Sequence, residues 1–237
     1  MKIEVWSDYV CPFCYIGKRR LESALEKFPQ KDQVKIEFKS FELDPHAQRD
    51  TTESVYENLS KKYGMSIEET KKMTEGVAAQ AKSVGLDFDF DSMIRTNTLD
   101  AHRIAKFAEK QGKDKEVTET LLRAHFIEAK HIGDHETLAD LAVITGLNRQ
   151  EVEEVLKGNA YEEEVRADQF RAKDIGVQGV PFFVINEKYA ISGAQPTETF
   201  LNALQKVWEE ENEEVVLKPI STANHQGAMC TDDHCES

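Results

Sequence analysis

The amino-acid sequence predicts an α/β protein in which a strand, helix, strand unit and a strand, strand, helix unit flank a large all-helical insertion. Apolar and polar residues alternate with the period of two that is typical of strands near both ends of the folded region. Helical spacing replaces this alternation over residues 46–175. Residues 211–237 are acidic and polar. They contain too few apolar residues for burial to offset the conformational entropy lost on ordering, so we expect a mobile tail.

The first unit is predicted from two alternating runs and the helical stretch between them. The run at residues 2–7 predicts a strand, and helical spacing then begins at Pro12 and stops at Pro29. A second alternating run, residues 34–41, predicts another strand that ends near Asp44. The chain therefore opens as strand, helix, strand.

The insertion shows helix-start signals. Ser66 followed by Glu69 fits a capping box, and Asn148 with Glu151 fits one in looser form. These pairs predict helix starts inside residues 46–175.

The second unit begins with an apolar run at residues 180–185, and a short polar turn at 186–188 leads to another strand. A helix over residues 197–211 closes the unit. We therefore predict one α/β domain from two segments, an inserted domain and a tail: residues 1–45 with 176–210, residues 46–175, and residues 211–237.

Composition narrows the function classes. With 237 residues, 40% hydrophobic and 31% charged, the chain can form a substantial core without disulfides. Its net charge of -14 repels nucleic acid and anionic membrane surfaces, so we expect neither as a partner. The first residues carry no apolar signal-peptide segment, and no stretch is long enough to span a bilayer, which predicts a cytoplasmic protein.

The four cysteines form two close pairs, Cys11 with Cys14 and Cys230 with Cys235. Reducing cytosol disfavours structural disulfides and favours catalytic or metal-binding cysteines. Cys11 lies where a predicted strand passes into a predicted helix, and the positive end of the helix dipole favours a thiolate there. Pro12 suits the first helical turn because it needs no N–H partner.

Cys14 comes one turn after Cys11, where it could attack a mixed disulfide formed at Cys11 and release the substrate. The alternatives are a zinc half-site or two ordinary buried cysteines. Zinc binding through this motif normally needs a second ligand pair, and none lies close in the sequence. We therefore predict a redox pair and no metal at this site.

Val180-Pro181 stands at the start of a predicted strand, where proline is normally unfavourable because it removes a hydrogen-bond donor. A cis peptide bond is one explanation, and it would turn the Val180 backbone outward to pair with an extended peptide. A trans proline on an edge strand is the other.

Taken together, Cys11-Pro-Phe-Cys14, Gly179-Val-Pro-Phe-Phe-Val184 and Ser192-Gly-Ala-Gln195 resemble the FrnE-like branch of the DsbA family of thiol-disulfide oxidoreductases, over roughly residues 1–210. The segment from Arg95 to Arg103 is similar to one in this branch and in two related groups, the 2-hydroxychromene-2-carboxylate isomerases and the kappa-class glutathione transferases.

The resemblance implies a thioredoxin-like fold with a helical insertion, Cys11 as nucleophile, Cys14 as resolving thiol and Val180-Pro181 as a cis-proline loop facing the substrate. It also implies an enzyme that exchanges or isomerises disulfides in polypeptides, without a cofactor, with glutathione as a possible redox partner. The alternative is a glutathione-dependent isomerase or transferase of small aromatic compounds. In those relatives a serine commonly replaces the first cysteine, so Cys11 favours disulfide exchange. The oligomeric state is not predicted.

Further candidates flank these motifs. Phe13 is the best candidate for an exposed apolar contact, whereas Trp6 and Tyr9 are more typical of a core. Pro12, Phe13 and Val180 are the predicted substrate contacts. His102 and Arg103 are placed beside the cleft by the resemblance, to bind a small anion or raise the positive potential, and His102 joins the predicted substrate contacts. An ordinary surface histidine is the alternative.

The tail pair could relay electrons to Cys11 and Cys14, because a flexible arm of about 25 residues spans on the order of 25 to 30 Å. Some FrnE-like proteins carry a similar C-x4-C pair. The competing interpretations are a metal site made with His225 and His234, and a pair without function.

Overall fold

The computed structural model describes residues 1–212, 229–231 and 234–236. Over residues 1–212 the predicted order of elements is confirmed, with helices alone between the second and third strands, whereas the two short strands within residues 229–236 were not predicted. The elements are β1 Lys2–Ser7, α1 Pro12–Glu26, η1 Lys31–Gln33 (a 3-10 turn), β2 Lys35–Ser40, α2 Val55–Tyr63, α3 Ile67–Lys82, α4 Leu99–Lys110, α5 Asp114–Phe126, α6 His135–Ile144, α7 Arg149–Lys157, α8 Glu162–Asp174, β3 Phe182–Ile185, β4 Tyr189–Ser192, α9 Thr197–Glu211, β5 Met229–Thr231 and β6 His234–Glu236.

The main sheet runs in the order β2, β1, β3, β4 among the described residues. β1 is parallel to β2 and antiparallel to β3, so Val5 lies opposite both Phe38 and Phe183. The period of two sends Ile3 and Val5 into the core shared with α1 and α9, while Trp6 faces the side covered by α8. The sheet is therefore covered by helices on both faces.

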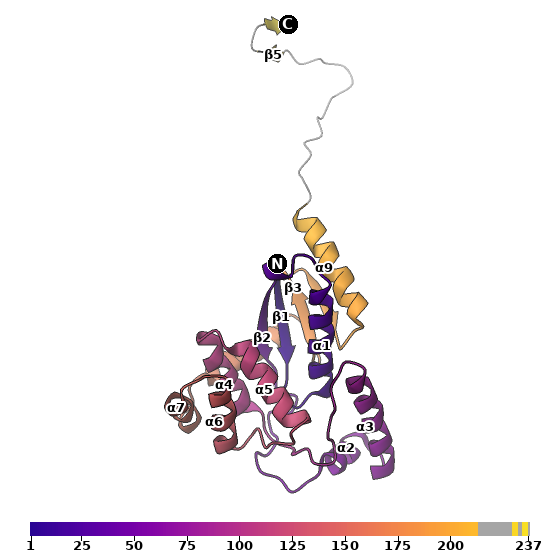
Figure 1. Cartoon of the computed structure of the whole chain (residues 1–237), viewed down its shortest axis with the longest axis vertical. Helices are drawn as coiled ribbons and strands as arrows, with labels where there is room; N and C mark the ends of the chain where they lie inside the picture. Colours follow the sequence, from indigo (N-terminus) through magenta and orange to yellow (C-terminus); the bar gives the residue numbers. More distant parts are fainter. Residues whose placement is uncertain (213–228, 232–233, 237) are drawn as a thin grey trace.

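Helices α2 to α7 of the insertion lie toward the carboxyl end of β1 (Figure 1), whereas α8 packs on the sheet. Their apolar side chains form one large core, to which Tyr9, just before α1, and Tyr15 and Ile16, within α1, also belong. The insertion thus packs on the segment that carries the cysteine pair, although its boundaries as a separate domain remain a prediction.

Local signals and boundaries agree closely with the sequence prediction, with small differences. Ser66 and Glu69 make a full capping box, and the Asn148 side chain caps α7 by accepting a hydrogen bond from the next turn. β2 ends at Ser40 instead of near Asp44, because its partner β1 ends at Ser7, whose carbonyl accepts a hydrogen bond from the Phe41 N–H at 3.1 Å. No described helix is long and apolar enough to cross a membrane.

Glu119 of α5 ties the insertion to α1. Its carboxylate accepts hydrogen bonds from Lys18 Nζ at 2.5 Å, from Tyr15 Oη at 2.7 Å and from the Arg19 guanidinium. Burial by itself would raise the pKa of Glu119, but the hydrogen bonds from Arg19, Lys18 and Tyr15 outweigh it and hold this pKa at about 2.

Replacing Glu119 with glutamine is expected to lower the free energy of unfolding by about 1 to 2 kcal/mol at pH 7, after discounting for partial exposure. Because the folded pKa is depressed, this stabilisation is complete above the ordinary value of 4.5 and is lost as the pH falls toward 2. Urea unfolding from pH 7 to pH 2.5 measures it, with the exposed Glu75→Gln as control. If the difference in unfolding free energy between wild type and Glu119→Gln did not shrink as the pH falls, the stabilising role of the Glu119 carboxylate would be contradicted.

Candidate active site

Cys11 lies at the N-terminus of α1, where β1 passes into the helix. It is the N-cap residue, with extended backbone angles of φ -95° and ψ 109°, and Pro12 follows in the first turn. The turn from Asp8 is closed by a hydrogen bond from the Cys11 N–H to the Asp8 carbonyl, 3.2 Å long. The sulfur therefore sits at the end of α1 whose unpaired N–H groups favour an anion.

Cys14 lies one turn further and is only 2% exposed. The Asp8 N–H donates to its Sγ at 3.5 Å. Burial, followed by the hydrogen bond and charge of neighbouring Cys11, raises the pKa of the Cys14 thiol well above its usual range, and the Ser7 hydroxyl opposes this. Cys14 is thus held as a protonated thiol beside Cys11.

The Val180–Pro181 peptide bond is cis, as the family resemblance implies. The Cys11 thiol donates to the Val180 carbonyl at 3.4 Å, so this loop lies against the nucleophile candidate from 169 residues away in the chain. Gly17 permits the close approach of α1, because a Cβ there would come within 3.1 Å of Pro181 Cγ.

The remaining predicted contacts divide into exposed and buried residues. Phe13 is 37% exposed beside the cysteines, and Pro12 and Val180 are half-buried. Trp6 and Tyr9 are core residues, as the sequence favours. Leu43 is 39% exposed, and its N–H bonds to the carboxylate of Asp8 in the turn before Cys11.

The alternative of an ordinary surface histidine is wrong, because His102 is buried, whereas the expectation that His102 contacts substrate stays a prediction. His102 is 2% exposed, its Nε2 lies 3.3 Å from Asp8 Oδ1, and its ring centroid lies 4.7 Å from that of Tyr9. In this structure the groups around the His102 side chain therefore belong to the protein itself.

Arg103 likewise does not provide an anion site. Its guanidinium donates to the carbonyls of Val155, Gly158 and Ala160 and pairs with Asp100. These bonds satisfy carbonyls at the carboxyl end of α7, so the charge is used within the fold.

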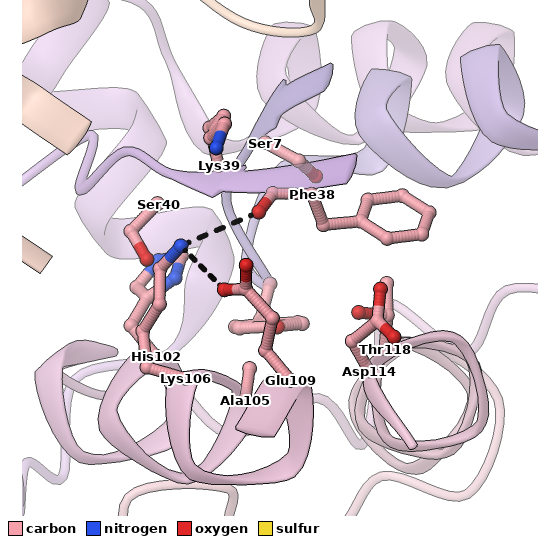
Figure 2. Close-up of a pocket in the computed structure, with 11 residues that line it drawn as sticks. Ser7, Phe38, Lys39, Ser40, His102, Ala105, Lys106, Glu109, Asp114 and Thr118 are labelled. Carbon is pink, nitrogen blue, oxygen red and sulfur yellow. Dashed lines mark hydrogen bonds and ion pairs between the residues drawn. The ribbon is translucent and has the colours of Figure 1, made fainter. Parts of the chain in front are cut away.

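A small cavity of about 20 Å³ adjoins His102 (Figure 2). Lys106 reaches into it from α4, with its Nζ 3.0 Å from a Glu109 carboxylate oxygen and 3.5 Å from the Phe38 carbonyl. Its lining is Ser7, Tyr9, Phe38, Lys39, Ser40, His102, Ala105, Lys106, Glu109, Asp114 and Thr118. The volume admits one or two water molecules and no organic substrate.

Sequence reasoning missed Asp8. The signal was an acidic residue in the short turn between β1 and Cys11, at a position that the alternating pattern leaves unexplained. Its carboxylate proves to be buried, and this requires tertiary partners that no local pattern reveals.

The tail candidates fall mostly outside the described residues. His225 lies outside them, and so does most of the segment predicted to be mobile. β5 and β6 pair as an antiparallel hairpin in which the backbone of Cys230 lies opposite that of Cys235. Within the described part of the chain, no group of three or more histidine, cysteine, aspartate or glutamate side chains could hold a metal ion.

Two known proteins are similar to this chain over most of its length. A probable DsbA oxidoreductase from Streptomyces coelicolor has 38% identity and a TM-score of 0.85, covering 100% of this chain and 99% of that one. YwbO of Bacillus subtilis (strain 168), an uncharacterized protein, is 29% identical over 206 residues, which are 85% of this chain and 94% of YwbO.

Two more distant structures share the fold alone. The cytosolic disulfide reductase DsbM of Pseudomonas aeruginosa, in a structure with GSH, has a TM-score of 0.62 and 13% identity, covering 88% of this chain and 100% of that one. A 2-hydroxychromene-2-carboxylate isomerase has a TM-score of 0.65 and 13% identity, covering 89% of this chain and 98% of that one.

The family model for the DSBA-like thioredoxin domain matches residues 2–205. With its thioredoxin-like sheet and helical insertion, the chain belongs to the DSBA-like thioredoxin domain family.

Proposed function

We propose that this protein is an oxidoreductase that exchanges disulfides in polypeptides through Cys11 and Cys14. The observation that carries this function is the meeting of three groups: the Cys11 thiol at a helix N-terminus, the buried Cys14 thiol one turn later, and the Val180 carbonyl 3.4 Å from Cys11 Sγ. Family membership supports thiol-disulfide chemistry in general terms.

The reaction proceeds in two exchanges. The Cys11 thiolate attacks one sulfur of a substrate disulfide, a mixed disulfide forms, and the other substrate sulfur leaves as a thiolate that takes up a proton. Cys14 then loses its proton and attacks Cys11, releasing the first substrate sulfur. The substrate gains two electrons and the Cys11–Cys14 disulfide forms, while the reverse sequence oxidises a dithiol.

Exposed apolar surface beside the pair supports a polypeptide substrate. Phe13 projects from the first turn of α1, and the Leu43 N–H bonds to Asp8, which places Leu43 next to the same turn. Val180, with Pro12, completes the proposed contact surface, since an extended peptide could pair with the backbone at the cis-proline loop.

Several finer assignments belong to this proposal. We place the chain in the FrnE-like branch, in the cytoplasm, with glutathione as a redox partner that is not a bound cofactor. The hairpin pairing of Cys230 with Cys235 supports the proposed tail relay, because opposed residues in an antiparallel pair lie close together.

Equilibration of the full chain with glutathione buffers, combined with insulin-reduction and scrambled-ribonuclease assays, tests this function. We expect a Cys11–Cys14 disulfide that forms reversibly, and turnover in at least one assay. A potential well below the cytosolic value would identify a reductase, and one well above it an oxidant or isomerase. Tight glutathione binding without any redox turnover would overturn the proposal in favour of the isomerase or transferase alternative.

A further inference from the structure

Asp8 is the residue whose backbone contacts both cysteines. Its carbonyl accepts the Cys11 N–H at 3.2 Å, and its own N–H donates to Cys14 Sγ at 3.5 Å. Asp8 is only 1% exposed. Its carboxylate is therefore removed from water within the same turn that holds the two sulfurs.

Two groups from distant segments hold this carboxylate in place. The Leu43 N–H donates to Oδ2 at 2.7 Å, and His102 Nε2 on α4 lies 3.3 Å from Oδ1. His102 is itself enclosed, with Tyr9 against its ring. The acid and the imidazole thus form a buried pair that links α4 of the insertion to the cysteine turn.

We propose that Asp8 and His102 are positioning residues that tune the redox equilibrium of Cys11 and Cys14 through the charge of the Asp8 carboxylate. The inference rests on the proposed redox function of these cysteines. A buried negative charge disfavours a nearby thiolate, so Asp8 destabilises the reduced form relative to the disulfide. The N–H of His102 offsets part of that charge. Neither residue gains or loses electrons.

The other ionisable groups around the pair are less suited to this role. Burial raises the pKa of Tyr9, and burial lowers that of His125 on α5 to about 4, so both remain neutral near pH 7. Beyond His102, the charged residues of the cavity lining are Lys39, Lys106, Glu109 and Asp114, none of which has a hydrogen bond to the cysteine turn among the described contacts.

The test measures the equilibrium between the full chain and glutathione at pH 7. Oxidation of Cys11 and Cys14 is read by acid quenching, alkylation and mass spectrometry of their own peptide, so the tail cysteines do not interfere. Asp8→Asn keeps the shape and removes the charge. We expect it to lower the equilibrium constant for oxidation by glutathione disulfide at least tenfold, about 30 mV toward a stronger oxidant.

His102 is tested through its donor group and through a double variant. His102→Leu removes the N–H that offsets the carboxylate and is expected to raise the same constant at least threefold, whereas His102→Gln, which keeps a donor, stays within twofold of wild type. In the Asp8→Asn background, His102→Leu should have no further effect, because His102 acts through Asp8. Lys106→Met, one turn along α4, controls for lost packing on that helix.

The outcomes separate the possible failures. If Asp8→Asn and His102→Leu lower the melting temperature but leave the constant within twofold of wild type, the two residues are merely structural and the inference is wrong. If Asp8→Asn does not fold, the difference in equilibrium constant between His102→Leu and His102→Gln decides whether the inference holds: equal constants for the two variants would contradict it. If the wild-type protein forms no Cys11–Cys14 disulfide at any glutathione ratio, the proposed function itself fails.

Discussion

Replacing Cys11 with serine is expected to lower the turnover of disulfide substrates on the order of 10³-fold or more, as loss of a catalytic nucleophile does in other enzymes. A serine hydroxyl remains protonated at neutral pH and cannot form a mixed disulfide. The fold should persist, since the exchange of sulfur for oxygen leaves the backbone bond to Asp8 in place. Insulin reduction with glutathione, with circular dichroism to confirm folding, measures this loss.

Cys14→Ser is the matched control, because it differs by the same atom three residues away. It should also stop turnover, but here the mixed disulfide at Cys11 accumulates and is detected as a covalent complex on a non-reducing gel. Equal trapping by the two variants, or unchanged turnover in Cys11→Ser, would show that Cys11 is not the attacking thiol.

Phe183→Ala is expected to have the largest effect on stability, about 3 to 5 kcal/mol off the free energy of unfolding. Phe183 is 1% exposed in β3, packs edge-on against Phe200 of α9 with ring centroids 4.8 Å apart, and lies opposite Val5 in the sheet. Removing its ring leaves a cavity between the sheet and its covering helices. Urea unfolding with a freely fitted m-value provides the measurement.

Phe170→Ala makes the same chemical change on the surface. Phe170 is 72% exposed on α8, so its removal should change the stability by no more than about 0.5 kcal/mol. A loss of similar size at both positions would mean that Phe183 does not owe its effect to burial.

The order of elements could be predicted because it depends on local patterns. The signals are interactions within a few residues or strong steric constraints: the alternation of apolar and polar residues near both ends, the helix cap at Ser66 and the proline at position 181. That Cys11 lies beside the cis-proline loop could be predicted because the two motifs together resemble a known family.

The environment of His102 could not be predicted in the same way. On a helix, a histidine followed by an arginine is equally compatible with a surface, an anion site or an internal bond. The outcome depends on Asp8 and on the carbonyls at the end of α7, which lie on other elements. Burial of these polar groups depends on tertiary contacts, so the residues next to them in the sequence do not predict it.

The long interval between Cys11 and Val180 also matters during synthesis of the protein. The cysteines leave the ribosome before the carbonyl that faces Cys11, which follows 169 residues later. At a usual elongation rate of about 5 to 20 residues per second, this delay lasts on the order of 10 to 30 seconds. Throughout that time the nascent chain exposes two thiols without the loop that faces them in the finished fold.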